Sequence, residues 1–265
     1  MLAAERRDLL LTRLRADGKL VAKELALELG LSEDSIRRDL RDLAAAGLCQ
    51  RVYGGAVPAS RALVDYAARS EVEPTSKRAV ARLAATLVRP GGVVLLDGGT
   101  TTLAVAEALP LDLDCTVITH SPTISVALLS HPHVEVILLG GRIFKHSAVT
   151  CGAAAVEAAA RVSADVFLLG VTGVHRTHGL TTGDADEAAM KRALSARAAE
   201  TYVLASAEKL GAVSRYRVLR LEDVTGIITD GSPDDTIDRI REGGTTVLPD
   251  SEVGGWRHHT TVTDQ

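Results

Sequence analysis

A short polar segment after an apolar run carries the clearest chemistry in this sequence, namely Asp97-Gly98-Gly99-Thr100-Thr101-Thr102. The apolar run Val93–Leu96 predicts a buried strand, and Leu103–Leu109 predicts a helix. A strand, a Gly/Thr turn and a helix in this order leave free backbone N–H groups at the positive end of the helix, where an anion can bind. The threonine hydroxyls can donate to phosphate oxygens, and Asp97 can accept from a sugar hydroxyl. A glycine turn capped by threonine is the alternative, and the segment alone does not separate the two.

The composition is typical of a globular protein with one large domain or two smaller ones. Of the 265 residues, 46% are hydrophobic and only 3% are aromatic, so Ala, Val and Leu must build most of the core. A net charge of −4 argues against a polybasic coat. Cys49, Cys115 and Cys151 form no CxxC pair and have no histidine at ligand spacing, which predicts neither a metal site nor disulfides. We expect a cytoplasmic protein with no cofactor and no membrane partner, because no apolar run of ~18 residues exists and the first residues are charged.

The first sixty residues predict a helix-turn-helix. Apolar residues recur with a helical period in three segments, Ala4–Ala16, Ala22–Leu29 and Glu33–Ala46. A short strand at Lys19–Val21 is possible between the first two. Gly30 suits the left-handed end of the second helix, and Ser32 suits the N-cap of the third. Two helices joined through this turn have helix-turn-helix geometry.

The third predicted helix carries arginines in an arrangement that suits DNA. Glu33 can pair with Arg37, and Asp34 with Arg38, at i, i+4 spacing. Arg41 has only arginines one turn before it, which costs a few tenths of a kcal/mol (~0.2–0.5) in an isolated helix. A polyanion reverses the sign of that cost, because the arginine fork binds phosphates and guanine edges. A solvated charged face is the alternative, but the turn and the charges together favour DNA.

A basic strand over Leu48–Tyr53, ended by Gly54-Gly55, predicts the wing of a winged helix. Arg51 and Tyr53 would lie near the phosphate backbone. The complete set of predicted DNA-binding residues is Ser32, Ser35, Arg37, Arg38, Arg41, Arg51 and Tyr53.

The remaining residues predict a linker and a second domain. We place the DNA-binding domain at 1–57, a linker with room for a short helix at 58–73, an α/β domain at 74–250 and a disordered tail at 251–265. The predicted strands are Val93–Leu96, Thr116–Thr119, Val134–Leu139, Val166–Val171, Thr201–Ala205, Gly226–Thr229 and Thr245–Leu248. The predicted helices are Thr75–Val88, Thr101–Leu109, Thr123–Leu129, Ala153–Val162, Glu187–Ala198 and Pro233–Arg241. Their alternation predicts a largely parallel sheet covered on both faces, with ligands bound beyond the carboxyl ends of the strands.

Further polar residues could reach the same edge. Gly179–Thr182 predicts a Gly/Thr turn that leads into a helix. Glu187 and Lys191 have i, i+4 spacing, which alone favours a surface ion pair worth ~0.2–0.5 kcal/mol. Lys209 alone is typical of a solvated loop lysine.

Both halves of the chain resemble one family. The N-terminal motifs, which include Leu29-Gly30-Leu31-Ser32 and Ser35-Ile36-Arg37-Arg38-Asp39-Leu40, resemble the DNA-binding module of DeoR-family transcriptional regulators. The motifs Asp97–Thr102, Leu139-Gly140-Gly141, Gly179–Thr182, Glu187 with Lys191, and Lys209 with Gly211 resemble the family's C-terminal sensor domain, which is similar in fold to ribose-5-phosphate isomerase. The resemblance implies that a phosphorylated sugar binds with its phosphate on the Gly/Thr turn. The implied effector-binding residues are Asp97, Gly98, Gly99, Thr100, Thr101, Thr102, Thr119, Ser121, Glu187, Lys191 and Lys209.

Two positions depart from the family pattern. His120 stands in Thr-His-Ser where members usually have Thr-Asn-Ser, and Ser206 stands where they usually have an aspartate three residues before the lysine. We expect His120 to be a loop histidine without a ligand role. The serine removes one candidate hydroxyl acceptor or catalytic carboxylate.

These observations predict an α/β protein made of a winged helix-turn-helix and a largely parallel sensor domain. The predicted function is DNA-binding regulation, as a repressor of sugar or polyol metabolism genes controlled by a phosphorylated sugar. A homo-oligomer on repeated operator half-sites is expected, because one small reading head buries too little surface for tight binding.

Two other functions remain open from the sequence. The first is a sugar-phosphate isomerase that uses the same pocket with Glu187 or Asp97 as its base. Against it, the loop Leu204–Lys209 lacks the expected acid, and no unpaired carboxylate or histidine stands out. The second is a sensor that binds only a protein partner, which would show no salt-dependent DNA binding.

Overall fold

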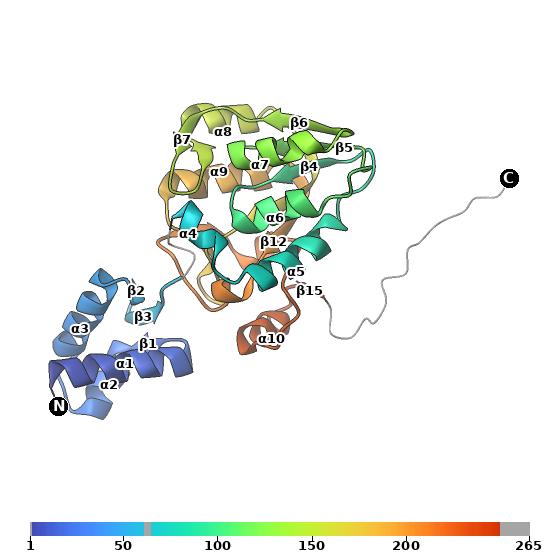
Figure 1. Ribbon diagram of the computed structural model, residues 1–265. Coiled ribbons are helices and arrows are strands. Elements are labelled where there is room, and N and C mark those ends of the chain that lie inside the picture. Colours follow the sequence, from blue (N-terminus) through green and yellow to red (C-terminus); the bar gives the residue numbers. More distant parts are fainter. Residues whose placement is uncertain (1, 61–64, 250–265) are drawn as a thin grey trace.

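The N-terminal domain packs three helices against a small antiparallel sheet. The computed structural model describes residues 2–60 and 65–249, and Figure 1 shows this domain as the blue part of the ribbon. Its elements are α1 (Ala3–Asp17), β1 (Leu20–Val21), α2 (Ala22–Leu29), α3 (Glu33–Ala45), β2 (Cys49–Val52) and β3 (Gly55–Pro58). The three predicted helices are confirmed to within one residue at each end. The strand β3 was not predicted, and it pairs with both β1 and β2.

The core of this domain lies between α1 and α3. Ile36 and Leu40 of α3 are buried with Leu10 of α1 in one apolar cluster. Gly55 is required where β3 crosses β1, because a Cβ there would lie 1.7 Å from the carbonyl oxygen of Leu20. The helix-turn-helix is therefore fixed to the hairpin that follows it.

The second domain is built on a seven-stranded sheet in which every adjacent pair of strands is parallel. The strand order is β15-β14-β12-β9-β4-β5-β6. These strands are β4 (Val93–Leu96), β5 (Cys115–Thr119), β6 (Val134–Leu138), β9 (Ala164–Gly170), β12 (Ala198–Leu204), β14 (Gly226–Ile228) and β15 (Val247–Leu248). Each corresponds to one of the seven predicted strands, so the predicted parallel architecture is confirmed.

Helices cover both faces of this sheet, as the apolar strands require. Val94 and Leu96 of β4 belong to one core cluster, whereas Leu95 between them belongs to the other, because successive side chains of a strand point to opposite faces. Helices α5 to α7 contribute to the first cluster and α8 to α10 to the second. The helices are α5 (Pro74–Ala85), α6 (Thr100–Ala108), α7 (Pro122–Ala127), α8 (Ala153–Ala159), α9 (Ala185–Ser195) and α10 (Asp235–Glu242).

Two small sheets lie outside the predicted pattern. They contain β7 (Arg142–Phe144), β8 (Val149–Cys151), β10 (Gly173–His175), β11 (Gly179–Thr182) and β13 (Tyr216–Leu219). The prediction of a Gly/Thr turn at Gly179–Thr182 is wrong. These residues form β11, which pairs with β10 and β13, and only the end of β11 leads toward α9.

The segment between the domains packs against the second domain on both sides of residues 61–64. Pro58 accepts a hydrogen bond from the backbone N–H of Val213, and the hydroxyl of Ser60 donates to the carbonyl oxygen of Thr172. The short helix α4 (Tyr66–Ser70) follows, next to α6 in Figure 1. The predicted tail at 251–265 lies outside the described residues. Within the described ranges, no helix has both the length and the apolar character needed to cross a membrane.

Candidate DNA-binding surface and effector pocket

The three arginines of α3 lie on the face opposite its buried side. With about 100° of rotation per residue, Arg37, Arg38 and Arg41 fall within an arc of about 100°. Ile36 and Leu40 point the other way into the core. All three arginines are exposed, so the helix offers a continuous cationic face to a partner.

The ion pairs on this face differ from the prediction at one position. Arg37 pairs with Glu33 at 2.6 Å, as predicted. The predicted pair between Asp34 and Arg38 is not formed, and neither Arg38 nor Arg41 has an ion pair with any described residue. Two adjacent guanidinium groups are thus available to phosphates or base edges.

The remaining predicted DNA-binding residues lie at the start of α3 and on the hairpin. The hydroxyl of Ser32 accepts from the backbone N–H of Ser35 at 3.2 Å, which confirms Ser32 as the N-cap. Arg51 is exposed on β2, and Tyr53 is fully exposed at the turn between β2 and β3. This hairpin has the place of a wing after a recognition helix.

The second candidate site lies beyond the carboxyl ends of β4 and β9, at the N-terminus of α6. Gly98 has no space for a side chain, because a Cβ would lie 1.9 Å from Cγ1 of Val149. Gly99 has a φ angle of 135°, a conformation that favours glycine, and it is the N-cap of α6. The first N–H groups of α6, which have no acceptor within the helix, therefore lie at the edge of a pocket.

This pocket is small and strongly polar. The space that it leaves for water-sized spheres is about 30 Å³, which holds two or three water molecules. A sugar phosphate is larger than this space, so it either displaces part of the lining or extends into the solvent outside the pocket. The lining residues come from α4, α5, α6, α9 and the strand ends, and they are Arg69, Lys77, Gly98, Gly99, Thr100, Thr101, Thr102, Gly170, Val171, Thr172, Thr182, Glu187, Lys191, Glu208 and Lys209.

Asp97 is fully buried behind the pocket, and both of its carboxylate oxygens accept from protein donors. Its carboxylate accepts from Nζ of Lys191, from Nε2 of His120 at 2.8 Å and from the backbone N–H of Gly170 at 2.8 Å. Burial alone would raise the pKa of Asp97, but the charge of Lys191 and the bonds from His120 and Lys191 outweigh burial and lower this pKa to about 2. Asp97 therefore anchors Lys191 from behind the lining, and its contact with an effector stays a prediction.

His120 is also fully buried, and it fixes the other side of Asp97. Its Nδ1 lies 2.8 Å from the carbonyl oxygen of Thr150, so each ring nitrogen faces an acceptor. Both contacts are hydrogen bonds only when the ring carries both protons. His120 does not line the pocket, but it is part of the buried network that positions Lys191.

Four cations line the pocket, and they outnumber the two carboxylates of the lining even when Asp97, which pairs with Lys191 behind the lining, is counted. The cations are Arg69, Lys77, Lys191 and Lys209, and each is at most 8% exposed. Burial lowers the pKa of Lys209 to about 8, and it lowers the pKa values of Lys77 and Arg69 as well. Nζ of Lys209 donates to the Thr101 hydroxyl at 3.0 Å. Such a concentration of desolvated cations at a helix N-terminus is suited to an anion.

Two buried polar atoms of this pocket lack a hydrogen-bond partner. They are Nε of Arg69 and Oε2 of Glu208; across the residues that the structure describes, only Oγ of Ser147 shares this property. An unsatisfied buried group costs about 1–3 kcal/mol. The pocket thus contains one unused cationic donor and one unused anionic acceptor.

The structure brings together eight of the eleven residues predicted to bind the effector. Gly98, Gly99, Thr100, Thr101, Thr102, Glu187, Lys191 and Lys209 line the pocket. Asp97, Thr119 and Ser121 lie outside its lining. Thr119 accepts from the N–H of Ser121, whose hydroxyl lies 2.9 Å from that of Thr123. These two residues shape the turn after β5.

Spacing alone was misleading for the charged side chains. Glu187 and Lys191 are 5% and 2% exposed, so the surface pair that their spacing favours is wrong, because α9 turns this face toward the pocket. Lys209 is likewise buried and not solvated. The loop before Lys209 does contain an acid in the pocket, Glu208, whose Oε1 accepts from the hydroxyl of Ser206 at 2.9 Å. Glu208 is not an unpaired carboxylate, because its Oε1 also lies 3.8 Å from Nζ of Lys77.

Three ionisable pocket residues were missed from the sequence. Nothing in the pattern distinguishes Arg69 in a five-residue helix or Lys77 on an amphipathic one. Glu208 could have been found as the acid next to the position where the family pattern expects one. Lys77 donates to the carbonyl oxygen of Arg69 and lies 3.8 Å from Glu208, so it joins the two other missed residues.

Comparison with known proteins agrees with both domains. The model of the DeoR-like helix-turn-helix domain matches residues 6–62, and that of the DeoR C terminal sensor domain matches residues 72–231. The HTH-type transcriptional regulator GlpR of Haloferax volcanii is 35% identical over 252 residues, which are 94% of this chain and 98% of that protein. The HTH-type transcriptional repressor GlcR of Bacillus subtilis is 31% identical over 245 residues, 90% of this chain and 94% of that one.

Among solved structures, the chain is similar to ribose 5-phosphate isomerase A of Methanocaldococcus jannaschii. The TM-score is 0.38 and the identity 19%, over 50% of this chain and 52% of that one. A winged helix-turn-helix joined to an α/β domain with a buried polar pocket defines a DNA-binding transcriptional regulator. Because its family models and its full-length relatives agree, the chain belongs to the DeoR family of transcriptional regulators.

Proposed function

We propose that this protein is a cytoplasmic repressor of sugar or polyol metabolism genes and that a phosphorylated sugar in the pocket controls it. In this proposal α3 enters the major groove, with Ser35, Arg37, Arg38 and Arg41 at bases or phosphates. Arg51 and Tyr53 add contacts to the phosphate backbone. Ser32 contributes by capping the helix. A homo-oligomer places two or more of these domains on repeated half-sites.

One observation carries the effector assignment. Four buried cations and the N-terminus of α6 surround the Gly/Thr turn, while only two carboxylates line the same pocket. Asp97 offsets the charge of Lys191 from behind the lining, so the other three cations face two carboxylates. A phosphate group offsets the remaining positive charge, and the threonine hydroxyls and N–H groups supply donors. Two of these cations contact the turn directly: Lys191 donates to Asp97, and Lys209 donates to the hydroxyl of Thr101.

An isomerase using the same pocket is the second candidate, because Glu208 is a buried carboxylate with a free oxygen. We favour the regulator. Asp97 is a poor general base at a pKa of about 2, since a base works best when its pKa is near the working pH. Glu187 is engaged by the Thr182 hydroxyl at 3.2 Å and lies 3.8 Å from Lys191.

A thermal-shift screen of phosphorylated sugars and polyols tests the effector assignment. Binding to the native state raises its stability by mass action, so a phosphorylated ligand at 100 times its Kd adds about 2.7 kcal/mol. The unphosphorylated counterparts are the controls, and an equal response to them refutes the phosphate site. Incubating each hit with the protein and measuring its isomer tests the alternative, because turnover at ordinary enzyme rates contradicts the sensor.

A further inference from the structure

Helix α4 connects the pocket to the chain segment that leads to the DNA-binding domain. The segment leaves β3 at Pro58 and meets the second domain through Ser60, whose hydroxyl donates to the Thr172 carbonyl. It then forms α4, and Arg69 of that helix lines the pocket together with Thr172. The effector pocket and the linker therefore share lining residues.

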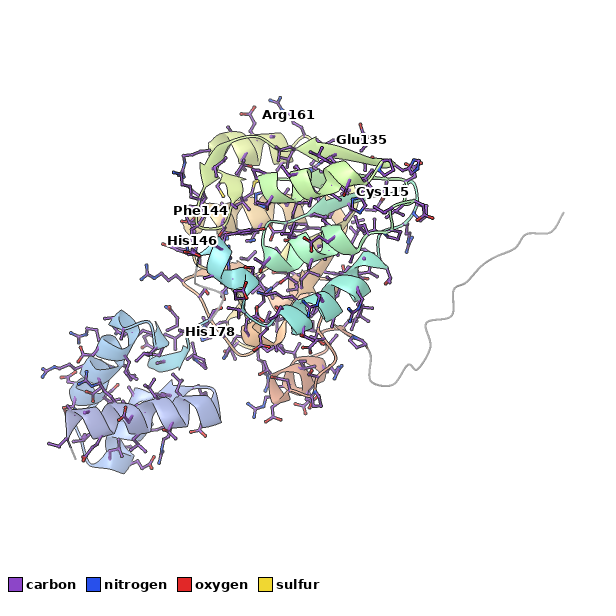
Figure 2. The ribbon with its side chains drawn as sticks, viewed as in Figure 1. Cys115, Glu135, Phe144, His146, Arg161 and His178 are labelled. Atoms are coloured by element: carbon purple, nitrogen blue, oxygen red, sulfur yellow. The ribbon has the colours of Figure 1, made fainter. Side chains whose placement is uncertain are left out.

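Arg69 is held in the pocket as a buried cation without a carboxylate partner. It is 8% exposed, and it forms no ion pair with any residue in the described ranges. Its Nη2 donates to the carbonyl oxygen of His146 at 3.2 Å, and its Nε has no partner. Figure 2 shows His146 beside α4. A desolvated guanidinium with a free N–H is the group that an incoming anion would complete.

Glu208 presents the opposite chemistry in the same pocket. Its side chain is 1% exposed, one oxygen accepts from Ser206, and Oε2 has no partner. A carboxylate oxygen of this kind accepts a hydroxyl group and repels a second anion. The two unsatisfied atoms together select a molecule that carries both an anionic group and hydroxyls.

Two further contacts hold α4 on the second domain, one at Arg69 itself and one at Tyr66. The carbonyl of Arg69 accepts from Nζ of Lys77, which itself lines the pocket. The Tyr66 hydroxyl lies 3.1 Å from that of Thr123 on α7. A sugar phosphate is larger than two or three waters, and Arg69 comes from the shortest α-helix of the lining.

We propose that Arg69 binds the anionic group of the effector while Glu208 accepts one of its hydroxyls, and that Arg69 thereby couples effector binding to the linker and to operator affinity. This inference rests on the proposed function of the pocket. It assigns two ligand residues that the motif resemblance does not include. It also makes α4 the element whose position differs between the free and the bound protein.

The test compares R69Q and E208Q in the full-length protein. The probes are glucose 6-phosphate, fructose 1-phosphate and glycerol 3-phosphate, with inorganic phosphate and the free sugars alongside. We expect R69Q to weaken binding of the phosphorylated probes and of inorganic phosphate about 10- to 100-fold, the worth of a charge-assisted hydrogen bond. E208Q should weaken the phosphorylated sugars and leave inorganic phosphate unchanged or tighter. The exposed residues Arg78 and Glu107 supply the matched controls R78Q and E107Q.

Coupling is measured as the ratio of operator Kd values with and without the best probe. A coupling of 1–3 kcal/mol changes this ratio about 5- to 150-fold in the parent protein and in R78Q. In R69Q the ratio should fall to within twofold of one, even at probe concentrations that saturate the variant. R69K keeps the positive charge but loses the two-pronged guanidinium donor, so its probe affinity and its ratio of operator Kd values should lie between those of R69Q and the parent protein. If R69Q does not fold, R69K replaces it in the test.

The outcomes separate the inference from the function that it rests on. If no phosphorylated probe binds the parent protein, the proposed function fails and this inference with it. If the probes bind the parent protein and also bind R69Q and R69K equally well, the effector site stands and the role of Arg69 is overturned. A saturated R69Q that still changes operator affinity as the parent does overturns the coupling role.

Discussion

Replacing Asp97 by Asn tests the buried network that positions Lys191 in the pocket. The carboxylate is 0% exposed and accepts from Lys191, His120 and Gly170, so solvent does not screen it. The difference between the ordinary pKa of 3.8 and about 2 in the folded protein corresponds to about 2.5 kcal/mol of stability at pH 7. Because the variant also leaves the buried Lys191 with Glu187, 3.8 Å away, as its one remaining carboxylate among the described residues, we expect a loss of about 2.5–5 kcal/mol.

The sign of the pH dependence provides the second half of this test. The folded-state pKa of Asp97 is below its unfolded value, so its contribution is complete above pH 3.8 and is lost as the pH falls through about 2. The part of the D97N loss that comes from this ionisation should therefore fall from about 2.5 kcal/mol at pH 7 to roughly half of that by pH 3. Urea unfolding followed by circular dichroism, with the second domain fitted as its own transition, measures both values. The exposed Asp112 supplies the control D112N. A D97N loss below about 0.5 kcal/mol, which is the size of an ordinary surface substitution, would refute the reasoning. A loss that does not change with pH would refute it as well.

Three further predictions follow from the two sites. R37A and R38A should each weaken operator binding by about 1–3 kcal/mol and lower the slope of log K against log salt concentration by about one. The control R161A removes an exposed arginine at the far end of the second domain (Figure 2) and should change neither quantity. Gel shifts at fixed and at varied salt measure both. Affinity for a phosphorylated sugar should fall as the pH rises above about 8, because Lys209 of the unliganded protein loses its proton there and must take one up to bind the anion. Calorimetry from pH 7 to about 9.5 should show this proton uptake. K209R keeps its charge over this range and should remove the pH dependence. G98A should abolish phosphate-dependent thermal shifts, since its Cβ would lie 1.9 Å from a valine methyl and displace the turn, whereas alanine at exposed Gly140 should not.

The sheet could be predicted from the sequence because its central strands are buried on both faces. Continuous apolar runs such as Val93–Leu96 and Val166–Val171 are too short for a helix and too apolar for an exposed loop, so a buried strand between helical segments fits them best. The short strands β7, β8, β10, β11 and β13 could not be predicted, because they pair outside the main sheet and contain Gly, Thr and Arg. Gly179–Thr182 illustrates this limit: its composition is that of a turn, and only pairing with β10 and β13 makes it a strand.

The backbone of the candidate pocket could be predicted from local pattern, whereas the charged residues Glu187, Lys191 and Lys209 were predicted only through the family resemblance. Gly98 and Gly99 stand between a strand and a helix, which places the turn at the ligand edge of the sheet. The spacing of Glu187 and Lys191 is the same for a surface pair and for a buried one, so periodicity does not reveal which face α9 presents. Arg69 reaches the pocket through the path of the linker, a tertiary feature that no local pattern encodes.

His120 departs from the family pattern, and its ring hydrogen-bonds within the buried network around Asp97. His120 was expected to be a loop residue without a ligand role, and it does lie outside the pocket lining. It nevertheless bridges Asp97 and the carbonyl oxygen of Thr150 in the core of the network. An asparagine amide at this position has two donors as well, on one nitrogen and closer to the backbone. The histidine ring reaches two acceptors on opposite sides.

The central claim is that a phosphorylated metabolite in the pocket changes the affinity of the protein for DNA. An operator sequence selected from a random duplex pool supplies the DNA, and fluorescence anisotropy at fixed salt gives its Kd. We predict at least a fivefold change in this Kd when a phosphorylated sugar that stabilises the protein is added, and none with the unphosphorylated sugar. An operator Kd that stays the same at saturating phosphorylated sugar contradicts the account.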